Sequence, residues 1–369
     1  MVQKYINSFL DKYTNYKEYW NYEDGCVLVG CQQLYEATGD EKYRKFILDY
    51  LAPFIEEDGT INNFPAEKYS IDSFNCSKIL FFAYKETKDE KYKKAIDYSI
   101  HWLMKQPRTS DGNFIHKAVY PAQVWLDGLY MAQPFYMQYE TVFNKKENYN
   151  DILSQFRNVR KYMFDNNKKL YYHGYDSDKI QSWADKKTGL SANFWLRSIG
   201  WYLIALIDTI DNMSQEMYEH YRELCDIFRE AIDGILSYRD KESGLFYQVV
   251  DCHDNKDNYT ETSGSAMIAY AVMKAARLEV ISFEKYADLG ADIFDCLVKE
   301  KLVKSEDNDE ICLCDICKVA GLGPGEQRDG SIGYYLSEPR VSDDSKGTGP
   351  FIMAYAQKIM LDAEKQNRN

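Results

Sequence analysis

One carboxylate, Asp127, stands in a markedly apolar and aromatic stretch, QVWLDGLYMAQPF. Burial in such surroundings disfavours the charged form of a carboxyl group, so we expect the pKa of Asp127 to be raised. A raised pKa suits a general acid that works near neutral pH. The structural alternative is an aspartate that caps a helix or hydrogen-bonds to a neighbouring one. Asp127 is therefore the leading candidate for proton transfer.

A second carboxylate, Asp72, lies in YSIDSFN, just before a predicted apolar helix. Taken alone, its simplest interpretation is the N-cap of that helix. It can also assist catalysis, because a second carboxylate near Asp127 would raise the pKa of the protonated partner. The two roles are compatible, and we predict that Asp72 assists Asp127.

Two of the five histidines and two residues beside Asp127 are suited to binding a sugar. His116, in GNFIHKAVYPAQ, and His173, in YYHGYD, could hydrogen-bond to hydroxyls or to a carboxylate. A loop histidine is more often a structural hydrogen-bonding group, which is the alternative. Gln123 and Trp125 stand just before Asp127. We predict that these four residues bind the substrate.

The segment FWLRSIGW supplies three further candidates, Trp195, Arg197 and Trp201. The planar fork of arginine matches a carboxylate with two parallel hydrogen bonds. A tryptophan face can stack against a sugar ring. The alternative is an arginine in an internal ion pair beside two core tryptophans. On the functional interpretation, these three residues bind an acidic sugar.

The composition favours such a ligand. Tyrosine occurs 32 times, against 18 phenylalanines and 6 tryptophans. Tyrosine and tryptophan pair an apolar ring with a polar edge, which suits a sugar-binding cleft, although wide helix packing explains them equally well. The net charge of −13 argues against nucleic acid and anionic membranes as partners. A small acidic oligosaccharide is compatible, because a few local cations outweigh a distant negative field.

The nine cysteines indicate reduced thiols. The N-terminus has no secretory signal, so we expect a cytoplasmic protein, and no run of apolar residues is long enough for a transmembrane helix. The segment CLCDICK spaces Cys312, Cys314 and Cys317 as C-x-C-x-x-C, but no fourth ligand stands nearby, so packed cysteines are favoured over zinc. Phosphate-loop, H-E-x-x-H and G-x-S-x-G motifs are absent.

The elements that position these residues are helices in alternation. An internal repeat relates 35–51 to 84–100, and each copy reads as a helix end, a turn and a helix start. Apolar helices are predicted at 26–37, 73–87, 123–143, 195–212, 263–276 and 349–363. Amphipathic helices are predicted at 2–16, 42–56, 91–105, 148–164, 216–238 and 282–298.

Apolar helices are buried and amphipathic helices cover them, so the pattern predicts an all-α (α/α)6 barrel of six inner and six outer helices. An open α-solenoid is the alternative. We expect one domain over 1–369, with short hairpins at 169–176 and 244–250 and a long functional loop at 299–348. Inner helices of such a ring start on one face, which would gather the candidate residues in one cleft.

The chain resembles glycoside hydrolase family 105, the unsaturated rhamnogalacturonyl hydrolases, and more distantly the unsaturated glucuronyl hydrolases of family 88. The resemblance covers nearly the whole chain. It rests on GNFIHK, QVWLDGLYMAQPF, YHGYD, FWLRSIGW, ETSGSAMIAYA and VAGLGPGEQRDGSIGYYLSEPRVSDDSKGTGPFIMAYA, in that order. CLCDICK carries more cysteines than this stretch of the family.

The resemblance implies an (α/α)6 glycoside hydrolase without metal or cofactor. Such an enzyme hydrates the double bond of the 4,5-unsaturated uronic acid that polysaccharide lyases leave at the non-reducing end of pectin fragments. It implies that Asp127 protonates C4 and then helps water attack C5, that Asp72 assists, and that the other residues named above hold the sugar. An unsaturated glucuronyl hydrolase acting on glycosaminoglycan or ulvan fragments, and a non-catalytic oligosaccharide-binding toroid, are the alternatives.

Overall fold

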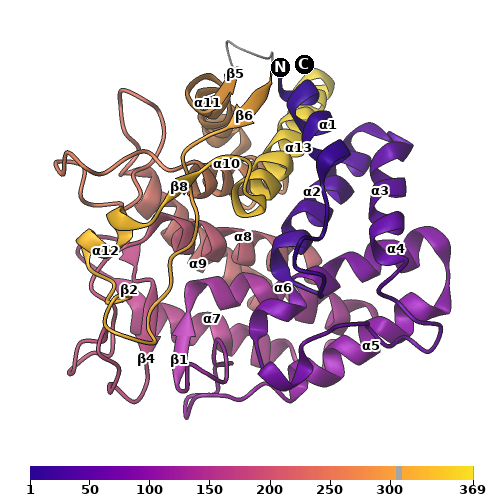
Figure 1. Cartoon of the computed structure of the whole chain (residues 1–369), viewed down its shortest axis with the longest axis horizontal. Helices are drawn as coiled ribbons and strands as arrows, with labels where there is room; N and C mark the ends of the chain where they lie inside the picture. The colour runs from indigo at the N-terminus through magenta and orange to yellow at the C-terminus, as the bar shows by residue number, and fades with distance from the viewer. Residues whose placement is uncertain (305–309, 369) are drawn as a thin grey trace.

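The computed structural model describes residues 1–304 and 310–368 (Figure 1). Within these residues, the predicted apolar segments form an inner ring of helices, each buried along most of its length. They are α2 (Tyr22–Thr38), α4 (Ile79–Thr87) with the 3-10 turns Ile71–Phe74 and Cys76–Lys78 before it, α6 (Leu126–Val142), α8 (Leu196–Asn212), α10 (Thr262–Arg277) and α13 (Ser345–Arg368).

The predicted amphipathic segments form the outer ring. They are α1 (Val2–Lys12), α3 (Glu41–Leu51), α5 (Glu90–Met104), α7 (Tyr149–Met163), α9 (Tyr218–Leu236) and α11 (Phe283–Lys301). Five of them, α3, α5, α7, α9 and α11, pack on the inner helix that precedes them. Each turns an apolar stripe inward and leaves its charged face in water.

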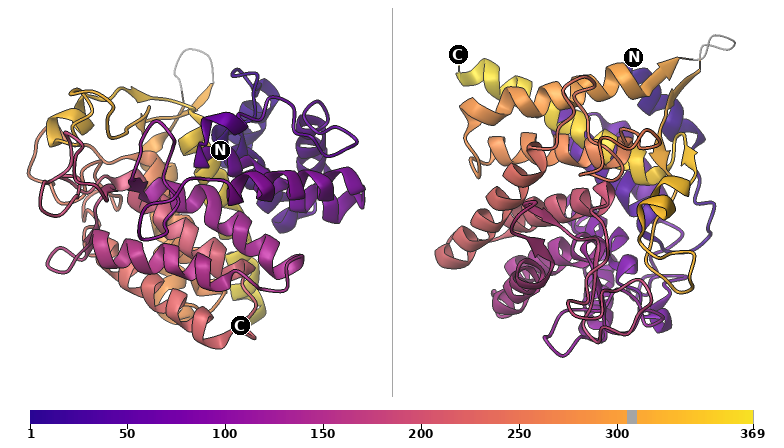
Figure 2. Two further views of the ribbon diagram at one scale, coloured as in Figure 1. Left: turned by 90° about the horizontal axis from the view of Figure 1, so that it is seen from below. Right: turned by 90° about the vertical axis from the view of Figure 1, so that its left-hand side faces the viewer.

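The inner ring closes on itself. Helix α8 packs between α6 and α10, and the last inner helix, α13, packs against both α10 and the first inner helix, α2 (Figure 2). This closure confirms the (α/α)6 barrel and excludes the open solenoid. In the described part of the chain, no helix is long and apolar enough to cross a membrane.

The internal repeat has a simple physical basis. Asp40 and Asp89 are the N-caps of α3 and α5, and their carboxylates accept hydrogen bonds from the backbone N–H of Lys42 (3.1 Å) and Lys91 (3.0 Å). Such caps satisfy backbone donors that the first helical turn leaves unpaired. The D-E-K-Y sequence therefore starts an outer helix in both copies.

The short strands differ from the prediction at three places. The helix predicted from 123 begins at Leu126, because β1 (Gln123–Trp125) pairs antiparallel with β4 (Gly174–Asp176). The segment predicted as one hairpin is shared between two sheets, since β3 (Leu170–Tyr171) pairs instead with β2 (Phe164–Asp165). The other predicted hairpin, 244–250, makes only isolated bridges, such as Trp195 with Val249.

The described part of the long loop before α13 packs against the barrel. It contains β5 (Leu302–Lys304), β6 (Ile311–Leu313), β7 (Ile316–Cys317), α12 (Ile332–Ser337) and β8 (Arg340–Val341), while 305–309 lie outside the described residues. Strand β5 pairs with β6, and β7 pairs with β8. Tyr334 and Tyr335 of α12 pack in a buried cluster with Trp195, so this loop reaches the end of the barrel where α8 begins.

Candidate active site

Asp127 lies in the first turn of α6, at the end of the ring where the inner helices begin. The backbone N–H of Leu126 donates to the carbonyl of His173 (3.1 Å), which ties the start of α6 to the β3–β4 segment. This bond places the His173 ring beside Asp127, with 3.5 Å between Nε2 and Oδ2. The Asp127 side chain is 13% exposed, so it faces a largely enclosed space.

Three buried polar atoms near this point make no hydrogen bond within the described residues: Asp127 Oδ2, His173 Nε2 and His116 Nδ1. The approach of His173 to Asp127 is thus a close contact without hydrogen-bond geometry. Buried polar atoms in proteins nearly always have partners, and a role in catalysis or binding is one explanation for an exception. The hydroxyl groups of a sugar would supply such partners.

Asp72 lies in the 3-10 turn before α4 and forms a cluster with two consecutive residues. Lys117 Nζ lies 2.7 Å from Asp72 Oδ2, and His116 Nε2 lies 3.5 Å from Asp72 Oδ1. This cluster is joined to the backbone, because Ile71 N–H donates to the carbonyl of His116 (3.0 Å). The Asp72 side chain is therefore paired with Lys117 and His116 and does not cap the helix that follows it.

The cluster fixes three protonation states. Burial acts to raise the pKa of Asp72, but Lys117, with smaller contributions from His116 and Lys17, outweighs burial, so the pKa of Asp72 lies below its ordinary value. Burial acts to lower the pKa of Lys117, but the Asp72 carboxylate outweighs burial, and the pKa of Lys117 is therefore raised. Burial lowers the pKa of His116 to about 4. At neutral pH the cluster is thus a carboxylate, an ammonium and a neutral imidazole.

Aromatic rings hold both histidines in place. The His116 ring stacks on Trp125, with 4.4 Å between centroids, and Trp125 stacks on Tyr120 at 4.8 Å. His173 lies against Trp195, with 4.7 Å between centroids, and its Nδ1 shares a hydrogen bond with the hydroxyl of Tyr335 (2.8 Å). Rings fixed in this way present their free nitrogen atoms in defined directions.

Two glutamines orient the tryptophans. The indole N–H of Trp125 donates to Oε1 of Gln123 (3.0 Å), and that of Trp195 donates to Oε1 of Gln248 (3.2 Å). Gln123 is buried, so its observed contact positions Trp125. Its contact with a substrate, like those of Trp125 and Trp195, stays a prediction.

Arg197 is surrounded by protein acceptors. Its Nε donates to Ser263 Oγ (2.7 Å), its Nη2 donates to the carbonyl of Cys317, and Nη2 lies 3.6 Å from Glu261 Oε1. The side chains of Arg197 and Glu261 are 2% and 0% exposed. Glu261 also caps α10 through Ser263 N–H and Gly264 N–H. These contacts match the alternative given above for Arg197, an internal ion pair. Its contact with an acidic sugar stays a prediction.

Trp201 lies one turn deeper in α8, within the main core. Its ring stacks on Tyr130, with 4.9 Å between centroids, and Lys78 Nζ lies 3.2 Å from the centroid of the same Tyr130 ring. Trp201 is thus 2% exposed and contacts α6 at Tyr130. Its predicted role in substrate binding is untested.

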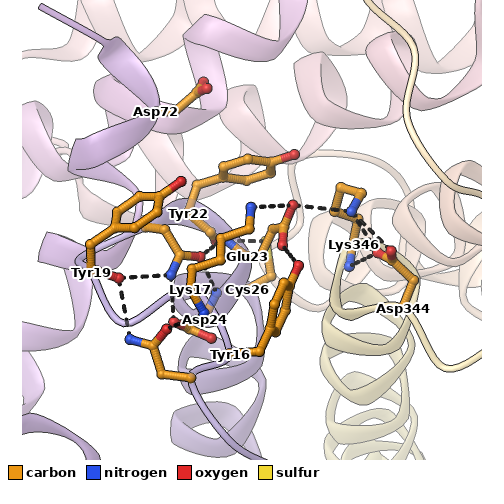
Figure 3. A network of polar contacts seen from close by, with 12 residues as sticks. Tyr16, Lys17, Tyr19, Tyr22, Glu23, Asp24, Cys26, Asp72, Asp344 and Lys346 are labelled. Carbon is orange, nitrogen blue, oxygen red and sulfur yellow. Dashed lines mark hydrogen bonds and ion pairs between the residues drawn. The ribbon is translucent and has the colours of Figure 1, made fainter. Parts of the chain in front are cut away.

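A cleft of about 490 Å³ opens outward from Asp72 and Lys117. One wall comes from the end of the N-terminal segment, with Tyr19, and from the start of α2, with Tyr22 (Figure 3). Clefts of this size bind small ligands and short oligosaccharides. Trp20, between Tyr19 and Tyr22 in the same wall, is fully buried and donates its indole N–H to the carbonyl of Ser73 (3.1 Å).

The N-terminal wall is anchored through Glu23 (Figure 3). Glu23 accepts a hydrogen bond from the Tyr16 hydroxyl and pairs with Lys17 (2.9 Å) and Lys346 (3.1 Å). Burial acts to raise the pKa of Glu23, but Lys346, Tyr16 and Lys17 together lower it to about 2. Lys346 is also paired with Asp344 (2.8 Å). The wall is therefore held by a charged network that joins α2 to α13.

Sequence reasoning missed two residues of the site. Lys117 directly follows His116 in the sequence, and its position beside a candidate histidine was the signal that could have identified it. Tyr335 stands in the loop over 299–348, but no local pattern distinguishes it from the neighbouring tyrosines.

In the described part of the chain, no group of three His, Cys, Asp or Glu side chains is arranged to hold a metal ion, and all nine cysteines are free thiols.

Comparison with known proteins places this geometry in a family. The family model described as Glycosyl Hydrolase Family 88 matches residues 1–362. A glycoside hydrolase from family 105 of C. acetobutylicum ATCC 824 is 40% identical, with a TM-score of 0.91 over 96% of this chain and 98% of that one. The unsaturated rhamnogalacturonyl hydrolase YesR of Bacillus subtilis (strain 168) is 28% identical over 265 residues, 70% of this chain and 72% of its own length.

A more distant likeness extends to the unsaturated glucuronyl hydrolase of Bacillus sp. GL1. It has a TM-score of 0.65 at 16% identity, over 92% of this chain and 85% of that one. At this identity the likeness shows a shared fold.

Proposed function

This chain belongs to Glycosyl Hydrolase Family 88 and is related to the glycoside hydrolases of family 105, and from that premise we propose that it removes the 4,5-unsaturated uronic acid from the non-reducing end of lyase-generated rhamnogalacturonan oligosaccharides. The observation that carries the proposal is the group of unpartnered polar atoms of Asp127, His173 and His116 at one end of the ring. The name of the Bacillus subtilis relative supports rhamnogalacturonan as the source of the substrate.

The proposed reaction is hydration of a vinyl ether. Asp127 in its acid form donates a proton to C4 while the C4=C5 electron pair forms the new C–H bond, which leaves positive charge on C5 and the ring oxygen. Water attacks C5, and its proton passes to the Asp127 carboxylate, so the acid is regenerated. The resulting hemiketal opens and releases the neighbouring sugar at C1.

The surrounding charges suit Asp127 to the donor role. Asp72 is held as a carboxylate by Lys117, and His116 is neutral, so neither supplies a proton at neutral pH. The Asp72 carboxylate instead stabilises the positive charge that develops on the sugar ring. Because protonation and water attack occur at adjacent carbons, one central acid suffices, whereas ordinary glycosidases use two carboxylates flanking the glycosidic bond.

Loss of the ultraviolet absorbance of the unsaturated uronate tests the proposal directly. The protein is mixed with lyase products of rhamnogalacturonan, and in parallel with lyase products of glycosaminoglycans and ulvan. We expect the fastest loss with the rhamnogalacturonan products. A preference for glycosaminoglycan or ulvan products would make the protein an unsaturated glucuronyl hydrolase, and no loss with any of them would leave only an oligosaccharide-binding toroid.

The variant Asp127→Asn is the matched control. General acid–base catalysis is worth about 10²–10⁴ in rate, so kcat should fall by at least about 10²-fold. Since Oδ2 of Asp127 makes no hydrogen bond within the described residues, the isosteric amide should leave the unfolding free energy nearly unchanged. Turnover at a near-wild-type rate would refute the role of Asp127.

A further inference from the structure

The cleft that opens from Asp72 carries features at its outer end that the proposed reaction does not use. We propose that Lys68 and Tyr19 form a second subsite there, which binds the carboxylate of another acidic sugar in the same oligosaccharide. The inference rests on the proposed function, because it assumes that the unsaturated sugar lies at the Asp127 end. It predicts a preference for fragments with two acidic sugars over fragments with one.

Of the candidate catalytic groups, Asp72 lines the cleft, and His116, which lies 3.5 Å from Asp72, also lies against Gly128, the residue after Asp127. The lining of the cleft includes Asp72 and Lys117 at the inner end and Lys68 and Tyr19 at the outer end. The segment before Asp72 runs beside the segment after His116, since Ser70 and Lys117 form an antiparallel bridge. A sugar chain entering at Asp127 would therefore extend along this wall toward Lys68.

The outer end presents apolar surface of the kind that binds sugar rings. Tyr19 is 37% exposed and Val119 is 68% exposed, and both line the cleft. Figure 3 shows the Tyr19 and Tyr22 rings on the side of the N-terminal segment that faces Asp72. Exposed aromatic side chains of this kind stack on sugar rings while the hydroxyl stays in water.

Lys68 differs from the other cations of the cleft. Lys17 is paired with Glu23 at 2.9 Å, and Lys117 with Asp72 at 2.7 Å. Among the described residues, no carboxylate lies within ion-pair distance of Lys68, whose Nζ lies 5.6 Å from the centroid of the Tyr19 ring. Within the part of the cleft that the structure describes, Lys68 is therefore the cation whose charge is not already paired.

The chemistry fits one carboxylate on one sugar. An ammonium attracts the carboxylate, and the ring below it contributes a stacking surface. Glu67 lines the same cleft and opposes this attraction. The contribution of Lys68 is modest because the side chain is exposed, so the subsite should change preference among substrates and not decide whether the chain binds sugar at all.

The test uses two matched ligands in the Asp127→Asn background, where turnover does not disturb binding. One is an unsaturated tetrasaccharide of rhamnogalacturonan with its inner acid free, and the other is the same sugar with that acid methylated. Calorimetry at low salt gives the ratio of their affinities for the parent, Lys68→Gln, Glu67→Gln and Lys161→Gln. Lys161 is a control on α7, with its ammonium 4.4 Å from the centroid of the Tyr162 ring and outside the cleft lining.

We expect the free acid to bind more tightly than the ester, and Lys68→Gln to reduce that ratio about three- to fivefold. Glu67→Gln should raise the ratio, Lys161→Gln should leave it unchanged, and added salt should shrink it. An equal ratio in the parent and in Lys68→Gln would overturn the subsite, as would failure of the parent to bind either ligand. If turnover of the unsaturated disaccharide is absent while the ratio behaves as expected, the proposed reaction fails and the anion subsite stands.

Discussion

Replacing Lys117 by methionine removes one charge and keeps the length of the side chain. In the wild type, Lys117 Nζ lies 2.7 Å from Asp72 Oδ2, and the two side chains are 30% and 14% exposed. Exposed pairs contribute about 0–1 kcal/mol, whereas breaking a fully buried pair costs about 3–5 kcal/mol. This pair lies between those limits, so Lys117→Met should lower the free energy of unfolding by about 2 kcal/mol at pH 7.

The sign of the pH dependence follows from Asp72. A carboxyl whose pKa is lowered in the folded state contributes stability above its unfolded pKa, about 3.9, and loses it as pH falls through the folded pKa. In Lys117→Met, burial is no longer outweighed, so the pKa of Asp72 rises. The cost of the substitution should therefore be largest at neutral pH and shrink toward about pH 3.

Urea unfolding of the wild type and the variant at pH 7, 5 and 3.5 measures this difference. Lys358→Met is the matched control, because Lys358 Nζ lies 2.6 Å from Asp362 Oδ2 but the aspartate is 45% exposed, and this pair should be worth no more than about 0.5 kcal/mol. The reasoning would be refuted if the two substitutions lowered the free energy of unfolding equally. It would also be refuted if the loss caused by Lys117→Met stayed the same as the pH is lowered from 7 to 3.5. The acid limb of kcat/KM should move toward neutral pH in the same variant.

Two further substitutions test contacts around the site. Tyr335→Phe removes the hydroxyl that bonds to Nδ1 of His173 at 2.8 Å, so kcat should fall several-fold while KM changes little, and an unchanged kcat would contradict the positioning role. Glu261→Gln leaves the buried Arg197 without its counter-charge and should lower the free energy of unfolding by about 3 kcal/mol, measured by urea titration. A loss below about 1 kcal/mol would mean that Ser263 and the Cys317 carbonyl satisfy Arg197 by themselves.

The sequence by itself determined the order and kind of the twelve barrel helices, whereas the short helix α12 in the last loop was not predicted. Apolar and amphipathic segments alternate along the chain, and each of the twelve predicted segments is a helix or, before α4, a helix with 3-10 turns. Helix patterns are local, because residues three and four apart share a face. The same locality placed Asp127 at the start of an inner helix, since the motif and the helix signal coincide.

Tertiary structure decided which side chains meet. Gln123–Trp125 became a strand because β4, about 50 residues later, supplies its partner. Arg197 contacts Glu261 and the carbonyl of Cys317, which is 120 residues away in sequence. Tyr335 bonds to His173 across a sequence separation of 162 residues. Such pairings depend on how the ring closes and how the last loop folds over it, and no local periodicity encodes contacts of that separation. The sequence thus proposed candidate groups for the chemistry, and packing determined the partners of these groups and the charges of Asp72, Lys117 and His116.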